Sequence, residues 1–402
     1  MKTAAKDFKM TELGPIPKDW EVKRLGELFD IGSSKRVFQS QWRDSGIPFW
    51  RARDIVSLNE GSGAIGGLYI DADLYSQYKS QYGVPAIGDL LVTAVGTLGE
   101  VYRVKDDKPF YFKDGNIIWL RNRGVCDSQF VEVLFAGGRL DDQIYDTAGG
   151  STVGTYTITN ANKTLIPLPP LPEQRKIAAA LSDVDEMIAA LEKLIEKKRK
   201  IKTGAMQRLL TGKTRLPGFK GARVEKRLGE VVEVLDNRRV PLNDSQRQSG
   251  PYPYCGANGI VDFIDRYIFD EEVILMAEDG GNFQDFANRP IAYKMRGKFW
   301  VNNHAHVLKA VIGIDQDFLF CQLVHKDITD TITGGTREKL TRGQLENLMV
   351  VFPLTLAEQK AIAKVLGDMD EEIAALEAEL AKTRQLKQGM MQELLTGKVR
   401  LG

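Results

Sequence analysis

The residues of this chain that could do chemistry form short, incomplete motifs. His304 and His306 alternate along a strand-like stretch and could offer two imidazoles to a zinc ion. No cysteine or carboxylate pair stands near them in register, which favours a hydrogen-bonding role. Asp89, Glu100 and Lys105 loosely resemble the residues of a metal-dependent nuclease, but Tyr102 occupies the position where that motif needs lysine. We therefore expect no catalytic residue and no metal site.

Two glycine patterns also fall short of nucleotide-binding motifs. Gly61, Gly63 and Gly66 have the spacing of a dinucleotide-binding loop, but neither a clear strand before them nor a helix pattern after them is present. Lys213 follows a glycine as in a phosphate-binding loop, but Gln207 stands where the first glycine of that motif belongs. We interpret the first pattern as a loop and the second as a helix end.

What remains is polar chemistry suited to reading DNA. Arginine pairs with guanine and asparagine with adenine through two hydrogen bonds each in the major groove. Polar and basic residues of this kind gather on glycine-rich turns in both halves of the chain. The alternative is that the asparagines and glycines simply form turns. The candidate DNA-binding residues are Arg51, Arg53, Thr97, Lys113, Asn116, Ser151, Thr152, Asn258, Asn282, Asn302, Asn303, His304, Thr336 and Arg337.

The elements that would position these residues come from a long internal repeat. Residues 173–216 and 358–401 align without gaps at an offset of 185, and 26 of the 44 aligned positions are identical. A repeat of this length is far longer than a solenoid unit, so the chain consists of two related halves.

Both copies carry a narrow apolar seam. Its residues are spaced 4, 3, 4, 3, 4, which is typical of a coiled coil. The pattern predicts two helices of about 38 residues each, or roughly 57 Å. We expect them to pair as an antiparallel coiled coil with an internal pseudo-twofold axis. The seam residues are Ile177, Leu181, Val184, Ile188, Leu191 and Ile195, and Ile362, Leu366, Met369, Ile373, Leu376 and Leu380.

The ends of the two helices are marked by their residue types. Prolines precede the first helix, Pro172 suits its first position, and Thr355 to Glu358 form a capping-box pattern at the start of the second. Gly212 and Gly397 stand where a left-handed residue would end each helix. We interpret two further glycines as points where the backbones approach closely: Gly204 and Gly389.

The segments that precede the two helices are predicted to form mixed α+β globular domains. Residues 23–27 recur as 226–230, and residues 149–152 align with 334–337, but the middles give no convincing alignment. Residues 89–95 and 273–277 are strand-like apolar runs. We expect a first globular domain over 1–167, a first helix over 168–215, a second domain over 216–353 and a second helix over 354–402.

Composition limits the function classes. The net charge is +1, so a DNA-binding role would need basic groups concentrated on one face or a partner subunit. The basic run 197–202 is best interpreted as a solvated helix face. Three separated cysteines and the absence of a long apolar run favour a cytoplasmic protein with no membrane span.

Five segments stand out beside the arrangement of two variable domains, each followed by a copied helix. They are Leu168 to Gln174, the two Leu-Leu-Thr-Gly-Lys helix ends, Tyr252 to Gly259 and Gly297 to His306. With these segments, the chain resembles the specificity subunit of type I restriction–modification systems over nearly its whole length.

This resemblance implies two target-recognition domains, each reading one half of a split, asymmetric sequence in double-stranded DNA. It implies that the helices set the spacing and dock two methyltransferase subunits, which carry S-adenosylmethionine and methylate adenine. A motor-nuclease subunit with ATP and Mg can join. The chain itself would need no cofactor. Two alternatives stay open: an enzyme, nuclease or methyltransferase, hidden in one globular half, and a coiled-coil scaffold that never contacts bases.

Overall fold

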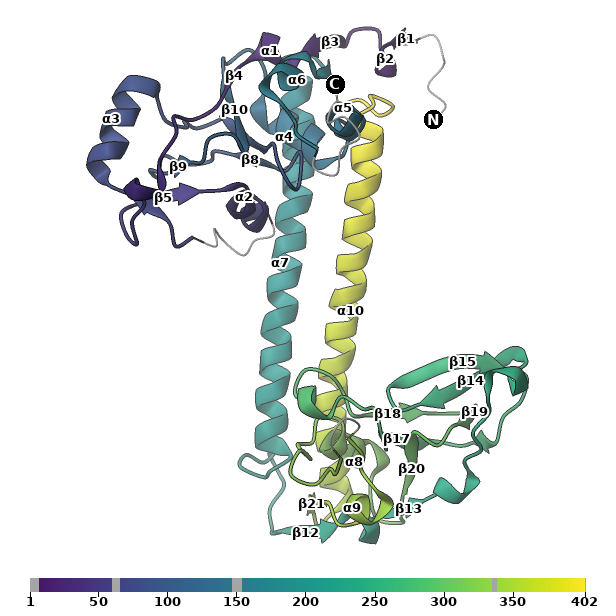
Figure 1. The fold of residues 1–402 in the computed structure, drawn as a ribbon. Coiled ribbons are helices and arrows are strands. Elements are labelled where there is room, and N and C mark those ends of the chain that lie inside the picture. Colours follow the sequence, from purple (N-terminus) through teal and green to yellow (C-terminus); the bar gives the residue numbers. More distant parts are fainter. Residues whose placement is uncertain (1–6, 60–65, 147–153, 335–337, 402) are drawn as a thin grey trace. The chain divides into compact units, whose positions relative to one another are not determined.

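The computed structural model describes residues 7–59, 66–146, 154–334 and 338–401 (Figure 1). The chain divides into two compact units. The first unit contains residues 1–190 and 379–402, and the second contains residues 191–378. Among the described residues, no helix is long and apolar enough to cross a membrane.

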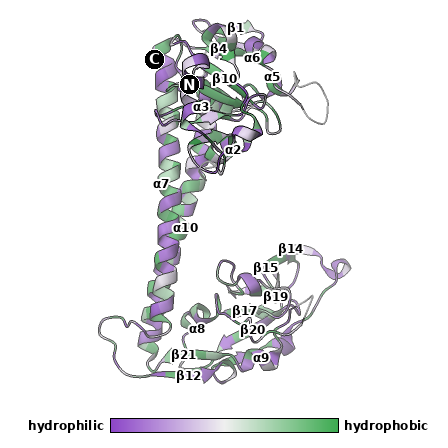
Figure 2. Ribbon diagram, turned by 60° about the vertical axis from the view of Figure 1, so that its left-hand side comes forward, coloured by the Kyte–Doolittle hydropathy of each residue, from purple (hydrophilic) through white to green (hydrophobic). Residues whose placement is uncertain are grey.

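Two long helices dominate the fold. Helix α7 (Leu171–Leu209) and helix α10 (Leu356–Leu394) each have 39 residues, which confirms the predicted length. Gly212 and Gly397 follow their ends with φ values of 78° and 69°, so both copies stop in the left-handed conformation that glycine favours. The helix-end interpretation of Lys213 is therefore correct. Figure 2 shows hydrophobic and hydrophilic residues alternating along both helices.

The apolar seam is shielded along both helices. None of its 12 residues is exposed. In the first unit, Ile177 and Leu181 of α7 join the core that also contains Leu394 of α10. In the second unit, Ile362 and Leu366 of α10 join the core that contains Leu209 and other residues of α7's last turns. Each helix therefore contributes apolar side chains to the cores of both units.

Ion pairs also link the two helices within each unit. In the first unit, Lys387 Nζ lies 2.5 Å from Asp185 Oδ1. In the second unit, residues of the basic run 197–202 pair with acidic residues of α10, so this run is not simply a solvated face. The pairs are Lys198 with Glu372, Arg199 with Glu377, and Lys202 with Asp370.

The first unit is built around a four-stranded antiparallel sheet of order β4-β10-β7-β8. A two-stranded sheet, β3-β11, leads into α7, and a three-stranded sheet of order β6-β5-β9 contains one parallel pair, β5 with β9. The strands are β1 (Phe8–Thr11), β2 (Gly14–Pro17), β3 (Glu21–Arg24), β4 (Phe29–Gly32), β5 (Ile47–Trp50), β6 (Tyr69–Ile70), β7 (Leu90–Thr93), β8 (Val101–Arg103), β9 (Tyr111–Phe112), β10 (Ile117–Asn122) and β11 (Leu165–Leu168). The helices are α1 (Leu25–Leu28), α2 (Ala52–Asn59), α3 (Ala72–Tyr82), α4 (Ser128–Ala136), α5 (Asp141–Asp146) and α6 (Ile158–Lys163).

The second unit repeats this strand order, with one strand more in its third sheet. Its four-stranded sheet has the order β13-β20-β17-β18, its two-stranded sheet is β12-β21, and its third sheet has the order β15-β14-β19-β16, with β14 parallel to β19. The strands are β12 (Arg223–Arg227), β13 (Val232–Val234), β14 (Ser249–Gly256), β15 (Gly259–Ile264), β16 (Phe269–Asp270), β17 (Val273–Ala277), β18 (Ala292–Met295), β19 (Lys298–Val301), β20 (Ala305–Ala310) and β21 (Met349–Pro353). Its short helices are α8 (Gln316–Leu323) and α9 (Arg342–Glu346). The predicted strands at 89–95 and 273–277 correspond to β7 and β17, equivalent central strands of the two units.

The same side-chain contact fixes each long helix on its globular part. Gln174 Oε1 accepts a hydrogen bond from the Asp127 backbone N–H (2.9 Å), and Gln359 Oε1 accepts one from the Asp315 N–H (2.8 Å). Asp127 and Asp315 are the N-cap residues of α4 and α8, and each caps a phenylalanine N–H three residues later. The duplication therefore extends into the middle parts of the two globular segments, whose sequences do not align convincingly.

A buried carboxylate at the start of α7 receives the C-terminal segment of the chain. Both oxygens of Glu173 accept hydrogen bonds from Arg400, at 2.6 and 2.7 Å, and Oε2 also accepts one from Trp20 Nε1 at 3.1 Å. Arg400 makes two further hydrogen bonds to Asp19, at 2.9 and 2.6 Å. One arginine is therefore held between two carboxylates.

The equivalent carboxylate at the start of α10 has the reverse charge balance. Glu358 is buried and pairs with Arg215, whose Nε lies 3.0 Å from Oε1, and with Arg223 at 3.7 Å. Arg215 and Arg400 are separated by the repeat offset of 185, as are Glu358 and Glu173. Thr355 Oγ1 accepts from the Glu358 N–H at 3.4 Å, but the carboxylate of Glu358 is engaged by the arginines. The expected capping box is therefore only half formed.

The two mid-helix glycines do not mark close contacts. A Cβ atom at Gly204 or at Gly389 would meet nothing within 4 Å, so both positions border open space. The interpretation as points of close approach was wrong, because these glycines lie where no neighbouring side chain or backbone packs.

Gly389→Ala should stabilise the chain. Glycine in an exposed helix costs about 0.5–1 kcal/mol relative to alanine, and no neighbour obstructs the added methyl group. A higher urea midpoint would show this. Gly397→Ala is the contrasting variant, because φ is 69° there and the new Cβ would fall on the Pro17 ring. An unchanged or lower midpoint for Gly389→Ala would contradict the open-space assignment.

Candidate nucleic-acid interface

A cavity of about 800 Å³ opens in the second unit beside the β14–β15 turn, the end of β19 and the loop after β17. It collects four of the predicted DNA-binding residues, one of which lies 44 positions before the first of the other three in the sequence. They are Asn258, Asn302, Asn303 and His304. Strand pairing causes this convergence, since β14 is hydrogen-bonded both to β15 and to β19.

The β14–β15 turn is tightly held. Gly259 has a φ of 127°, a conformation that side chains disfavour. At Gly256 a Cβ atom would lie 2.8 Å from Val261 and 3.2 Å from the amide of Asn302. The hydroxyl of the half-buried Tyr293 donates to the Gly256 carbonyl at 2.6 Å. Burial raises the pKa of this tyrosine, so the hydroxyl stays a donor at all ordinary pH values.

The four predicted residues differ in burial and in their hydrogen bonds to the rest of the unit. Asn302 is buried and accepts the His304 backbone N–H at 2.8 Å. His304 Nδ1 lies 2.7 Å from Asp279 Oδ1. Asn258 donates to the Gly280 carbonyl at 2.9 Å, with its side chain at the cavity mouth. Asn302 therefore positions the loop, and the more exposed asparagines face the open cavity.

The cavity also contains polar residues that were not predicted. Asn243, Gln246 and Arg247 line it from the segment that precedes β14. Arg247 pairs with Asp262 at 3.3 Å and with Asp244. The only sequence signal was the polar composition of residues 243–248, which is equally typical of a solvent-exposed loop.

The remaining candidates of the second half are not gathered at this cavity. Asn282 donates to the Pro290 carbonyl at 3.0 Å and is not among the residues that line the cavity. It serves the turn in which it lies. Thr336 and Arg337 lie outside the described residues.

The five described candidates of the first half are not brought into one cavity. Arg51 is held by Asp54, with its Nε 3.6 Å from Oδ2, whereas Arg53 is exposed. Lys113 and Asn116 flank Asp114 and Gly115, which line a cavity of about 310 Å³, but neither lines it. Thr97, also exposed, contributes its carbonyl to a turn, and Ser151 and Thr152 lie outside the described residues.

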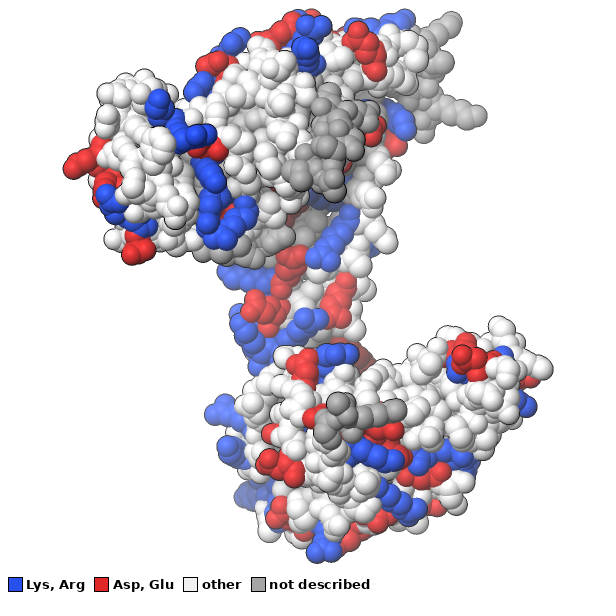
Figure 3. Space-filling model, viewed as in Figure 1, with Lys and Arg blue, Asp and Glu red and all other residues white. Residues whose placement is uncertain are grey.

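The loosely nuclease-like Asp89 is structural. It is buried, and its carboxylate accepts hydrogen bonds from the Ala86 N–H, the Asn122 N–H and Trp119 Nε1, at 2.8–2.9 Å. These three hydrogen bonds tie the carboxylate to the surrounding backbone and to Trp119, which is a structural role. Figure 3 shows acidic and basic groups interspersed on the visible faces, with a row of Lys and Arg crossing that of the first unit.

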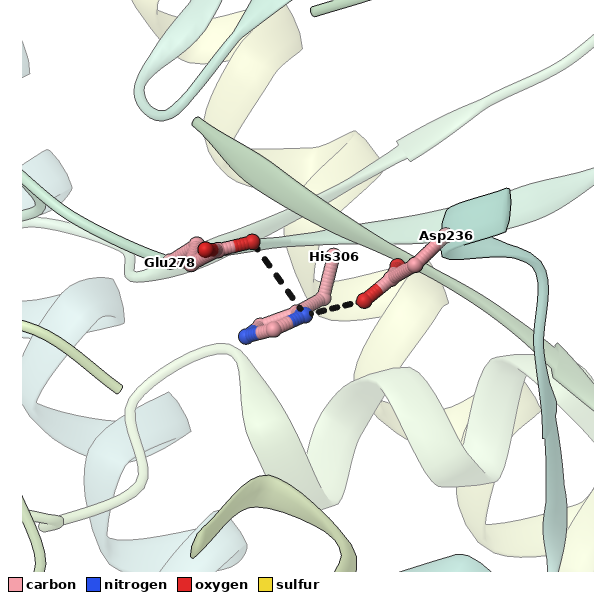
Figure 4. A group of neighbouring side chains, drawn as sticks. All are labelled: Asp236, Glu278 and His306. Atoms are coloured by element: carbon pink, nitrogen blue, oxygen red, sulfur yellow. Dashed lines mark hydrogen bonds and ion pairs between the residues drawn. The ribbon is translucent and has the colours of Figure 1, made fainter. Parts of the chain in front are cut away.

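A buried ionic cluster lies next to the cavity, around His306 of β20. His306 Nδ1 lies 2.7 Å from Asp236 Oδ2 and 3.7 Å from Glu278 Oε2, and Nε2 lies 2.7 Å from the Leu340 carbonyl (Figure 4). Both ring nitrogens therefore lie within hydrogen-bond distance of an oxygen atom. The hydrogen-bonding role predicted for the two histidines is confirmed.

The geometry of this cluster argues against a metal ion. Asp236, Glu278 and His306 have the donor atoms for one. However, Arg239 lies 2.7 Å from Glu278 and 3.3 Å from Asp236, and Lys339 lies 3.0 Å from Glu278. These cations already neutralise the carboxylates, and the His306 nitrogens are occupied. The cluster instead fastens the loop around Lys339 to the sheet beside the cavity.

The cluster should make the second unit sensitive to acid. Burial raises the pKa of Asp236, but the bonds from His306 and Val307 and the nearby Arg239 outweigh it and hold the pKa below its usual 3.8. Arg239 and Lys339 likewise hold the pKa of Glu278 below 4.5. Stability from these groups is present above pH 4.5 and is lost as the pH falls through the lowered pKa values.

Asp236→Asn should therefore lower the free energy of unfolding at neutral pH. The further decrease in this free energy between pH 7 and pH 3 should be smaller in the variant than in the wild type. Urea unfolding between pH 7 and pH 3 measures both effects. Chelator should leave the wild-type curve unchanged. If the variant and the wild type lose the same free energy of unfolding between pH 7 and pH 3, this account is contradicted.

A family model described as the type I restriction modification DNA specificity domain matches residues 17–203 and 223–386. The MjaVIII specificity subunit of a type I restriction enzyme from Methanocaldococcus jannaschii is 31% identical over 96% of this chain and 94% of that protein. A putative type I specificity subunit from Haemophilus influenzae is 36% identical, but the alignment covers 37% of this chain and 38% of that protein.

Solved structures share the fold. The S subunit of a type I restriction–modification system from M. genitalium matches with a TM-score of 0.64 at 18% identity, over 94% of this chain and 96% of that one. A chain from a study of assembly and conformational transition in a type I system matches with a TM-score of 0.57 at 19% identity, over 96% and 99% of the two chains.

Proposed function

Because this chain belongs to the type I restriction–modification DNA specificity family, we propose that its two units each read one half of a bipartite, asymmetric target in double-stranded DNA. The chain is a specificity subunit, a recognition protein and not a catalyst. The observation that carries the bipartite proposal is one sheet topology built twice in a single chain. Two copies with different side chains at their turns suit a target with two different halves.

The long helices would hold the two readers. We propose that α7 and α10 pair as an antiparallel coiled coil with an internal pseudo-twofold axis, and that their length sets the gap between the half-sites. The reciprocal contacts support this: Glu173 binds Arg400 in the first unit, and Glu358 binds Arg215 in the second. In an isologous interface, residue i of one copy meets residue j of the other and the reverse.

The proposed partners follow from the same family. Two methyltransferase subunits would dock on the helices and bring S-adenosylmethionine, and motor-nuclease subunits would bring ATP and Mg. The chain itself would need no cofactor and would act in the cytoplasm, away from membranes. At the second unit, Asn258, Asn303 and His304 are the proposed DNA contacts nearest the cavity. The other predicted contacts stay predictions.

Selection from random DNA tests the proposal. The chain, purified with its methyltransferase partner, should enrich one motif with two fixed parts and an unread gap. Enrichment of no motif would contradict sequence reading and favour a scaffold. Methylation or cleavage by the chain alone, given DNA, Mg and methyl donor, would contradict the non-catalytic role.

A further inference from the structure

The mouth of the second unit's cavity places two kinds of exposed group together. Asn303 is exposed, and no hydrogen bond joins its side-chain amide to another described residue. Ile260 and Val261 line the same cavity from β15, with 49% and 61% of their surfaces exposed. Exposed aliphatic side chains on an edge strand promote aggregation unless a ligand covers them. Because they lie beside an amide with no hydrogen-bond partner among the described residues, the site suits a ligand with both apolar and polar groups.

The cavity's single arginine is already engaged. Arg247 is paired with Asp244 and Asp262, and its guanidinium lies 5.0 Å from the centroid of the Tyr254 ring. Arginine with two hydrogen bonds to guanine is the commonest specific contact in the major groove. The Arg247 side chain is only 20% exposed and would have to leave the Tyr254 ring and both carboxylates to reach a guanine, so the cavity lacks a free guanine-reading group.

The major-groove edge of an A·T pair matches what the cavity does offer. Adenine presents N7 as an acceptor and N6 as a donor, which one asparagine amide can satisfy together, and thymine presents a methyl group. A G·C pair has no methyl group. We infer that this cavity reads an A·T base pair, with Asn303 hydrogen-bonded to adenine and Val261 against the thymine methyl group. This inference rests on the proposed function and adds the identity of one base pair.

Single-atom changes in the DNA test the inference. In the selected target, each adenine of the half-site read by the second unit is replaced in turn by 7-deazaadenine, which removes N7. Each thymine is replaced by uracil, which removes the methyl group. Binding by the complex of this chain with its methyltransferase partner is measured by titration. At one A·T pair, we expect about a tenfold loss with 7-deazaadenine and about a fourfold loss with uracil.

Protein variants then assign the contacts. Asn303→Ala should bind normal and 7-deazaadenine DNA equally weakly, and Val261→Ala should no longer distinguish thymine from uracil, because each variant has already lost the contact. Asn288→Ala and Ile312→Ala are matched controls. Both side chains are exposed in the same unit and neither lines the cavity. Their discrimination should equal that of the wild type.

The outcomes separate the two proposals. If the complex selects no motif, the proposed function fails. If it selects a two-part motif but no A·T pair responds to both base changes, the inference fails and the function stands. An Asn303→Ala variant that still loses tenfold with 7-deazaadenine would also overturn the assignment to Asn303.

Discussion

Glu358→Ala is expected to destabilise the second unit by about 3–5 kcal/mol, the usual loss when one partner of a buried ion pair is removed. Glu358 is buried and is the partner of both Arg215 and Arg223. The Arg223 side chain is only 9% exposed, so its charge is poorly solvated, and burial lowers its pKa. Removing the carboxylate would leave two neighbouring positive charges without compensation.

Glu173→Ala is the matched variant in the first unit and should cost less, about 1–3 kcal/mol. Arg400 is partly exposed and keeps both hydrogen bonds to Asp19 when Glu173 is removed. Denaturant unfolding followed by hydrogen exchange distinguishes the units, because the two carboxylates lie in different ones. Equal losses, or a larger loss for Glu173→Ala, would contradict the charge balance described here.

Four residues inserted after Ala190 and four after Ala375 are expected to widen the gap in the recognised sequence and leave both half-sites unchanged. These positions are equivalent in the repeat. Each insertion lengthens its helix by ~6 Å, which corresponds to roughly two base pairs at ~3.4 Å each. A four-residue insertion in a 4-3 seam unwinds the pair locally but does not break it.

The control carries the insertion in α7 alone. It puts the two seams out of register, so we expect it to lower the unfolding midpoint without giving a wider defined gap. Comparison of the selected motifs measures the effect. A gap that stays the same in the double insertion, with stability retained, would show that the helices do not set the spacing.

The helices could be predicted well from the sequence because their signals are local and strong. A 4-3 apolar spacing, prolines before one helix and glycines after both gave elements within one residue of the observed 39. The role of Gly204 could not be inferred in the same way, because an empty neighbourhood leaves no trace in a sequence.

The shared topology of the two globular parts was missed for a physical reason. A sheet is defined by backbone hydrogen bonds, which accept almost any pair of apolar sequences, so β7 and β17 can be equivalent without recognisable identity. The repeated contacts of Gln174 and Gln359 join side chains to backbone at α4 and α8. Their glutamines were visible in the repeat, but their partners lie at an offset of 188, not 185.

The candidate site was only partly predictable. Residue type identified Asn258, Asn302 and Asn303, and strand pairing brought them together. Residue type could not tell that Asn302 is buried as a positioning residue, or that Asn282 serves a turn. Arg247 was missed because its polar surroundings are those of an ordinary loop.

The most direct test of the central claim is a genome-wide map of methylated adenines in cells that express this chain with its methyltransferase partner. We predict that the methylated adenines fall in one asymmetric motif with two specific parts, separated by a gap of constant length. Methylation scattered without a motif, or confined to one uninterrupted sequence, would contradict two readers in one chain.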